Sequence, residues 1–147
     1  MILLYEFGTP SYLEGIALRD LVLRQPLGLS IHNDPLELEF DQIHIGFYEA
    51  EAGLVGTCTL KIQESGALKM RQVAVHPDFS GRGFGAKLVA YCERYALAQK
   101  ASKLYCHARE VAMPFYKKCG WGMEGEVFTE VGIPHYKMVF GGIDSQM

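Results

Sequence analysis

Alternation of apolar residues with polar or small ones predicts extended strands in the middle of the chain. The clearest run reads Ile43, His44, Ile45, Gly46, Phe47, Tyr48, as expected of a strand with one buried face. Two further apolar runs, at residues 54–62 and 67–75, are set apart by turn-forming residues at 49–53 and 64–66. The pattern therefore predicts an antiparallel meander of three strands.

The N-terminal part of the chain predicts one strand followed by one helix. Residues 2–7 are largely apolar and suit a first strand. Thr9 and Pro10 are typical of a helix start, and helical spacing then relates Leu13, Ile16, Ala17 and Leu21. Pro26 and Gly28 predict that the helix ends near Arg24. Residues 29–42 predict only an irregular loop or a short second helix.

The C-terminal half predicts a crossover helix, a parallel strand, a short helix and a closing pair of strands. The crossover helix would bury one face, made of Gly85, Leu88, Val89, Cys92 and Ala96. A strand at residues 103–108 should then lie parallel to the strand that precedes the helix. A short helix at 111–119 ends at Gly120, and strands at 124–131 and 134–140 are joined by a turn at 132–134.

Length and composition limit the class of protein. With 147 residues, of which 49% are hydrophobic, the chain is long enough for one domain with its own core. A net charge of −3 and the lack of a basic run among aromatics argue against a nucleic-acid partner. No basic N-terminal region precedes an apolar run and no 18 apolar residues are consecutive, so we expect a soluble cytoplasmic protein without a membrane partner.

The four cysteines do not indicate a metal site. Cys58, Cys92, Cys106 and Cys119 form no C-x-x-C pair and no Cys/His cluster at zinc spacing, so we expect no metal and interpret them as buried structural thiols. Cys119 lies close to a candidate catalytic residue, but a nucleophilic role would need a lowered pKa and a partner base.

One stretch carries the chemistry: residues 72–88, which read as an apolar strand, a loop with a proline, a glycine-rich turn and the start of a helix. Gly81, Gly83 and Gly85 let the backbone approach an anion, the first amides of the helix point at it, and Arg82 adds a positive charge. This order predicts a phosphate-binding turn.

Two other interpretations of the turn remain open. The glycines could serve only an ordinary connection between strand and helix. Gly81-x-Gly83-x-x-Ala86 also fits the dinucleotide fingerprint, which expects an acidic residue about 20 positions further on, at the end of the next strand. The next predicted strand, at 103–108, carries no carboxylate, so the nicotinamide interpretation is disfavoured.

Two motifs resemble the GCN5-related N-acetyltransferase (GNAT) family. Residues 73–85 resemble its acetyl-CoA motif, usually written Q/R-x-x-G-x-G/A, and Phe115-Tyr116-Lys117-Lys118-Cys119-Gly120-Trp121 resembles its F-Y-x-x-x-G-F signature. Residues 126–135 further resemble a bacterial subgroup typified by ElaA and YjcF. Ser80 stands where the family usually has Gln or Arg, and Arg109 where many members have Asn.

The resemblance implies a mixed α/β fold, a twisted six- or seven-stranded sheet flanked by helices, with an N-acetyltransferase domain over residues 1–140. The small and polar residues at 141–147 predict a flexible tail. The resemblance further implies acetyl-CoA as co-substrate. The pantetheine arm would bond main-chain groups along the strand and the pyrophosphate would meet the turn, which gives the cofactor-binding set Val73, Ala74, Val75, Gly81, Arg82, Gly83, Phe84, Gly85 and Ala86.

The resemblance also implies direct attack of a primary amine on the thioester in a ternary complex. Tyr116 would be the general acid that protonates the leaving thiolate, or alternatively a tyrosine that only packs under the cofactor. Candidates for the base are His107, His135, Glu126 and Glu130, and many members of the family work through water instead. Arg19 and Arg24 are candidate acceptor-pocket residues, or helix charges in salt bridges.

The alternative function is a catalytically weak acyl-CoA-binding or sensor domain. The acceptor, whether a small molecule or a peptide amine, is left open by the sequence, as are a homodimer and the use of acyl groups longer than acetyl.

Overall fold

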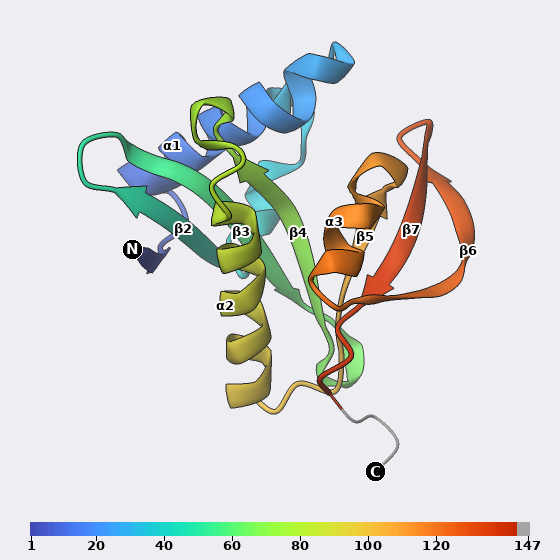
Figure 1. Cartoon of the computed structure of the whole chain (residues 1–147). Coiled ribbons are helices and arrows are strands. Elements are labelled where there is room, and N and C mark those ends of the chain that lie inside the picture. Colours follow the sequence, from blue (N-terminus) through green and yellow to red (C-terminus); the bar gives the residue numbers. More distant parts are fainter. Residues whose placement is uncertain (144–147) are drawn as a thin grey trace. The chain divides into compact units, whose positions relative to one another are not determined.

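Seven strands pair in the order β1-β2-β3-β4-β5-β7-β6 in the computed structural model, which describes residues 1–143 (Figure 1). The strands are β1 (Ile2–Tyr5), β2 (Ile43–Glu49), β3 (Gly53–Ile62), β4 (Leu68–Val75), β5 (Leu104–Arg109), β6 (Gly122–Glu130) and β7 (Ile133–Val139). The α-helices are α1 (Pro10–Arg19), α2 (Phe84–Ala98) and α3 (Met113–Lys118). The predicted mixed sheet with flanking helices is confirmed. Residues 144–147, part of the predicted tail, lie outside the described residues.

The chain falls into two compact units, which are described separately below. The first unit contains residues 1–61 and 72–91, and the second contains residues 62–71 and the chain from Cys92 onward. The chain passes between the units inside β3, after Lys61, inside β4, after Arg71, and inside α2, after Tyr91. The single N-acetyltransferase domain expected over residues 1–140 stays a prediction.

In the first unit, α1 begins where the sequence predicts. The Thr9 hydroxyl accepts a hydrogen bond from the backbone N–H of Tyr12 at 3.3 Å, and Pro10 is the first helical residue. This cap satisfies one of the amides that a helix start leaves unpaired. The chain continues past Arg19 as a π-helical turn, η1 (Asp20–Arg24), and a 3₁₀ turn that ends at Gly28 with a φ of +72°. The prediction of helical structure up to about Arg24 is therefore confirmed.

Residues 29–42, the part of the chain that the sequence left ambiguous, form two 3₁₀ turns, η3 (Ile31–Asn33) and η4 (Leu36–Glu39). Ile31 is completely buried and packs with Tyr12 and Ile16 of α1. The short η elements thus complete the core of the first unit.

The expectation that β2 buries only one face is wrong. His44 is 2% exposed, and its ring lies 5.6 Å from that of Tyr5 and 5.2 Å from that of Tyr12. On the same strand face Gly46 is also buried, and an added Cβ there would come within 2.7 Å of a Leu54 methyl carbon. Side chains from β1, β3 and α1 therefore cover the face that the alternation assigned to solvent.

In the second unit, β5 pairs in parallel with the first half of β4, with Leu68 opposite Leu104, as the crossover predicts. β7 pairs antiparallel with both β5 and β6. The turn between the late strands differs from the prediction of residues 132–134, because Glu130 pairs with Ile133 and only Val131 and Gly132 lie between them. Their φ values of +47° and +73° are typical of a type I′ hairpin turn.

Candidate active site

The glycine turn of the first unit has positive φ angles at two of its three glycines. β4 ends at Val75, and the backbone N–H of His76 then donates to the carbonyl of Val55 at 2.7 Å. Gly81 and Gly83 have φ values of +77° and +80°, and a Cβ added at either would meet nothing within 4 Å. The glycines are thus needed for backbone conformation, and the space above the turn is open. By helix geometry, the amides of the first turn of α2 have no intrahelical acceptors.

Two cations flank this turn, each seated on an aromatic ring. The Arg82 guanidinium carbon lies 5.0 Å from the centre of the Phe79 ring, and the Lys87 ammonium lies 6.0 Å from that of Phe84. The two rings stack on each other at 6.0 Å. Ser80, which replaces the usual Gln or Arg, donates its hydroxyl to the carbonyl of Pro77 at 2.9 Å. Arg82 and Lys87 therefore supply the positive charge of the turn.

The strand before the turn carries the other predicted cofactor residues. Ala74 is buried, while Val73 and Val75 are half-buried. Phe84 is buried and stacks on Phe47 at 4.2 Å, so its side chain belongs to the core and only its main chain is available to a ligand. Gly85 is half-buried and Ala86 exposed, in the first turn of α2.

Tyr116, the candidate general acid, lies in α3 of the second unit and is 7% exposed. Its ring centre lies 5.0 Å from that of Phe115 and 5.5 Å from that of Trp121. Burial raises the pKa of the Cys106 thiol to about 12, and a side-chain hydrogen bond with Tyr116 opposes part of this rise. The phenol of Tyr116 thus lies against a sulfur atom of β5.

Trp121, which follows α3, is buried and fixed at both ends of its indole ring. Its Nε1 donates to Glu93 Oε2 at 2.8 Å, and its ring lies between those of Tyr116 and Phe140, 6.2 Å from the latter. These contacts hold the C-terminal end of α3 in one orientation.

The structure brings together three of the four candidate bases. His107 on β5, Glu130 on β6 and His135 on β7 meet on one face of the second unit. His107 Nδ1 lies 3.2 Å from Glu130 Oε1, and His135 Nε2 lies 3.7 Å from Glu130 Oε2. Burial lowers the pKa of His107, while the hydrogen bond with Glu130 acts in the opposite direction. We call these three residues the histidine–glutamate cluster.

The cluster contains imidazole nitrogens that can accept a proton. His135 Nδ1 lies 2.8 Å from the carbonyl of Ile133, so it donates there and leaves Nε2 as the acceptor of the neutral ring. His107 Nδ1 similarly donates to Glu130 and leaves its own Nε2. A lowered pKa keeps His107 neutral near pH 7, the state that a base requires.

Glu126 does not join this cluster. The pairing of β6 with β7 shifts between Glu124 and Phe128, and Glu126 lies exposed inside this irregular stretch. Glu124 instead bridges Lys103 and Lys137 at 2.9 and 3.0 Å. A nucleophilic Cys119 is also disfavoured, because burial and then the charge of Glu93 raise the pKa of its thiol.

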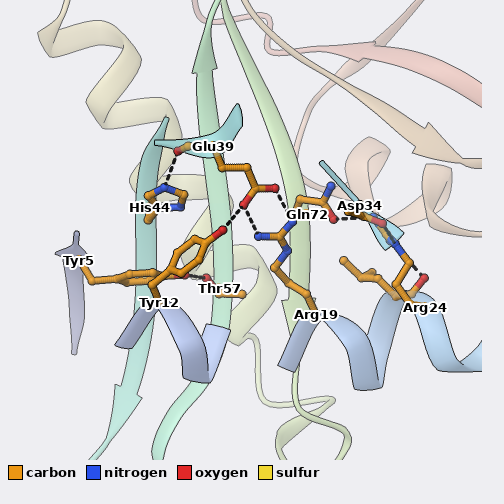
Figure 2. A network of polar contacts seen from close by, with 10 residues as sticks. Tyr5, Tyr12, Arg19, Arg24, Asp34, Glu39, His44, Thr57 and Gln72 are labelled. Atoms are coloured by element: carbon orange, nitrogen blue, oxygen red, sulfur yellow. Dashed lines mark hydrogen bonds and ion pairs between the residues drawn. The ribbon is translucent and has the colours of Figure 1, made fainter. Parts of the chain in front are cut away.

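The two arginines of the first helical segment have partners in the first unit (Figure 2). Arg19 is 1% exposed and makes a bidentate ion pair with Glu39, which also accepts a hydrogen bond from the Tyr12 hydroxyl at 2.8 Å. Arg24 binds Asp34 and Gln72. Arg19 is therefore part of a buried network. Glu39 and Asp34 lie in the ambiguous stretch 29–42, where no sequence signal marked them.

The described part of the chain has neither a group of metal-ligating side chains nor a helix that could span a membrane. Within residues 1–143, no three His, Cys, Asp or Glu side chains are grouped so that they could hold a metal ion. None of the helices in the same range is both long and apolar enough to cross a membrane.

Comparisons with known proteins agree with the fold. Residues 16–121 match the model of the Acetyltransferase (GNAT) family, so the chain belongs to this family and is by class an acetyl-CoA-dependent N-acetyltransferase. It is similar to "Uncharacterized N-acetyltransferase YjcF" of Bacillus subtilis (strain 168), with 29% identity over 80% of this chain and 86% of the relative.

Two solved structures share the fold over nearly their whole length. Escherichia coli ElaA gives a TM-score of 0.76 at 21% identity, covering 95% of this chain and 96% of that one. An aminoglycoside 6'-N-acetyltransferase complexed with coenzyme A gives 0.78 at 15% identity, with the same coverage.

Proposed function

We propose that this protein transfers the acetyl group of acetyl-CoA to a primary amine by direct attack in a ternary complex. The observation that carries the proposal is the glycine turn before α2, with two positive φ angles, an open space above the amides and two ring-seated cations. This arrangement suits a ligand with several phosphates, as acyl-CoA is. Family membership supports the same choice.

The cofactor would bind through main chain first and side chains second. Its pyrophosphate accepts hydrogen bonds from the amides of residues 81–86, and Arg82 and Lys87 balance its charge. Its pantetheine arm bonds the main chain of Val73 and Val75, in the manner of an added strand. These contacts hold the thioester in place while the amine approaches, and proximity supplies much of the rate enhancement.

Three proton transfers accompany the exchange of bonds. The acceptor ammonium gives a proton to the histidine–glutamate cluster, and the free amine then attacks the thioester carbonyl. A C–N bond forms, the C–S bond breaks, and the leaving thiolate takes a proton from the Tyr116 hydroxyl. The nitrogen of the new amide releases its second proton, which restores the phenol of Tyr116. The side-chain hydrogen bond between Tyr116 and Cys106 supports this choice of acid, because it brings the phenol against a sulfur atom.

The same hydrogen bond favours a second candidate, a domain that binds acyl-CoA without turning it over. If the Tyr116 hydroxyl stays hydrogen-bonded to Cys106 in the loaded protein, its proton is not directed at the leaving thiolate. The two candidates share the cofactor site and differ in the chemistry at Tyr116.

One pair of measurements separates these functions and tests the cofactor. Acetyl-CoA should raise the melting temperature, because a ligand of the folded state stabilises by mass action, whereas NADH should not. Loaded protein should then release many CoA molecules per chain with at least one member of a panel of polyamines, aminoglycosides and peptides with free amines. Stabilisation by acetyl-CoA without turnover across the panel would favour the binding domain, and stabilisation by NADH alone would refute both.

A further inference from the structure

Gln72 has a backbone conformation that its side chain does not favour. Its φ is +59°, in the left-handed region that residues other than glycine seldom adopt. Such residues carry strain and persist only where the surrounding structure holds them. Gln72 precedes Val73, the first of the main-chain groups assigned to the pantetheine arm. A change of its φ would therefore reorient the part of the chain that binds the cofactor.

The Gln72 side chain is held by an arginine that is itself fixed. Arg24 Nη2 donates to Gln72 Oε1 at 3.2 Å and to Asp34 Oδ2 at 2.7 Å, while Arg24 Nε donates to Asp34 Oδ1 at 3.3 Å (Figure 2). The side chains of Arg24 and Asp34 are only 17% and 21% exposed. The Arg24 guanidinium therefore binds Asp34 and Gln72 at the same time. The planar guanidinium group of arginine, with its five N–H donors, suits such a double contact better than the ammonium group of lysine.

The two segments that carry Arg24 and Asp34 are held together by further hydrogen bonds in the first unit. Asp20, at the start of η1, accepts hydrogen bonds from the backbone N–H of Ile31 and the side chain of Gln25, each at 2.8 Å. Ile31 is fully buried. The segment that carries Arg24 is thus tied to the segment that carries Asp34, so Arg24 reaches Gln72 from a fixed position.

We propose that Arg24 is a positioning residue, which holds Gln72 in its left-handed conformation and thereby orients the main chain of Val73 and Val75 for the pantetheine arm of acyl-CoA. The inference rests on the proposed function and adds to it a role for a side chain outside the turn. Arg24 acts through Gln72 and needs no contact with the ligand.

The expected effect follows from a shift in populations. Without Arg24, Gln72 relaxes to negative φ in most molecules, and the apparent dissociation constant rises by the inverse of the competent fraction. A hydrogen bond to a charged group is strong enough that its loss should raise the apparent dissociation constant about tenfold. The loss should fall on the pantetheine arm and spare the phosphates, which bind at the turn.

The test is a double-mutant cycle, read by calorimetry with three ligands. Arg24→Ala should weaken acetyl-CoA and acetyl-pantetheine by about tenfold each, and leave adenosine 3',5'-bisphosphate unchanged. Gln72→Gly should bind all three within about twofold of the wild type, because glycine adopts positive φ readily. In the Gln72→Gly background, Arg24→Ala should then have no effect on any ligand.

Two control variants sharpen the cycle. Arg82→Ala, at the turn, should show the opposite ligand pattern, with weaker binding of the bisphosphate and unchanged binding of acetyl-pantetheine. Gln72→Ala keeps the strain and removes the hydrogen bond, so it should behave like Arg24→Ala.

The outcomes distinguish failure of the inference from failure of the proposed function. If the wild type binds acetyl-CoA but Arg24→Ala weakens the bisphosphate equally, or if its effect persists in the Gln72→Gly background, the inference is wrong and the proposed function stands. If the wild type binds neither acetyl-CoA nor acetyl-pantetheine, both are wrong.

Discussion

Arg19 and Glu39 form a bidentate ion pair in the interior of the first unit, with Nη1–Oε1 and Nη2–Oε2 distances of 2.9 and 2.7 Å. They are 1% and 4% exposed, and the Tyr12 hydroxyl donates to the same carboxylate. The pair connects α1 to η4, across 19 intervening residues of sequence (20–38). Because both charges are out of water, each depends on the other.

Removing one charge of this pair should destabilise the protein strongly. Glu39→Gln leaves the Arg19 guanidinium buried without its counter-charge, so we expect the free energy of unfolding to fall by about 3–5 kcal/mol. Urea denaturation measures this. Arg19→Met with Glu39→Leu removes both charges and should recover most of the loss. An unchanged unfolding midpoint for Glu39→Gln would mean that the pair is not buried as described.

Filling the space above the glycine turn should abolish acetyl-CoA binding. Gly83→Asn introduces a Cβ, yet Asn tolerates positive φ better than most residues, so the variant should fold and lose the acetyl-CoA-induced rise in melting temperature. Gly28→Asn is the matched control, because Gly28 has a φ of +72° and equally open space at another turn of the same unit. A full temperature shift in Gly83→Asn would refute the assignment of the turn.

Replacing the proposed general acid should change the rate and leave affinity intact. Tyr116→Phe keeps the ring packed beside Trp121 and removes the donor, so kcat should fall by about 10² to 10⁴ while the acetyl-CoA dissociation constant hardly changes. Tyr95→Phe, a half-buried tyrosine of α2, should leave both unchanged. Loss of affinity alone would make Tyr116 a packing residue, and an unchanged rate would assign the proton to water.

The histidine–glutamate cluster should set the acid limb of the pH–rate profile. Because burial lowers the pKa of His107, the midpoint in kcat/KM should lie below the ordinary value of 6.5. Glu130 raises the pKa of His107 through its hydrogen bond and charge. Glu130→Gln should therefore move the midpoint of the acid limb to lower pH, and the variant should stay active at pH values where the wild type has lost activity. Full activity in His107→Gln with an unmoved acid limb would exclude His107 as the base. Inactivity of Glu130→Gln at every pH would identify Glu130 itself as the base.

The hairpin between β6 and β7 should become more stable with a better turn residue. Val131 has a φ of +47°, which a β-branched side chain disfavours, while Asn-Gly suits a type I′ turn. Val131→Asn should therefore gain about 1 kcal/mol, visible as a higher melting temperature. Val127→Asn, at an exposed position of β6, should give no gain. A lower melting temperature for Val131→Asn would mean that the Val131 side chain makes a stabilising contact.

Local signals in the sequence located most of the fold. Thr9 and Pro10 marked the start of α1, and the predicted helical crossover implied the parallel pairing of β4 with β5. The glycine turn was equally visible, because positive φ at Gly81 and Gly83 restricts the residue type. These features depend on residues that are neighbours in the sequence, so the residue types alone are enough to predict them.

Features set by distant residues were not visible in the sequence. His44 looked solvent-facing in an alternating strand, and only the rings of Tyr5 and Tyr12 explain its burial. Gln72 has a positive φ and a hydrogen bond from Arg24, 48 positions away, and its residue type gives no sign of either. For the same reason the sequence could identify four candidate bases but could not show which of them lie together. Only the pairing of β5, β6 and β7 shows that both histidines lie beside Glu130 and that Glu126 is not part of this cluster.

Trp121, fixed between Tyr116, Phe140 and Glu93, is the only tryptophan of the chain. Its intrinsic fluorescence therefore reports on a single site, next to the proposed general acid, without any label. The emission should be blue-shifted while the indole is buried, and should move to longer wavelength when the second unit unfolds and exposes the indole to water. In a variant of the first unit, an unchanged emission spectrum would mean that the surroundings of Trp121 and Tyr116 are intact. A loss of acetyl-CoA binding in that variant is then distinguished from a loss of structure around Tyr116.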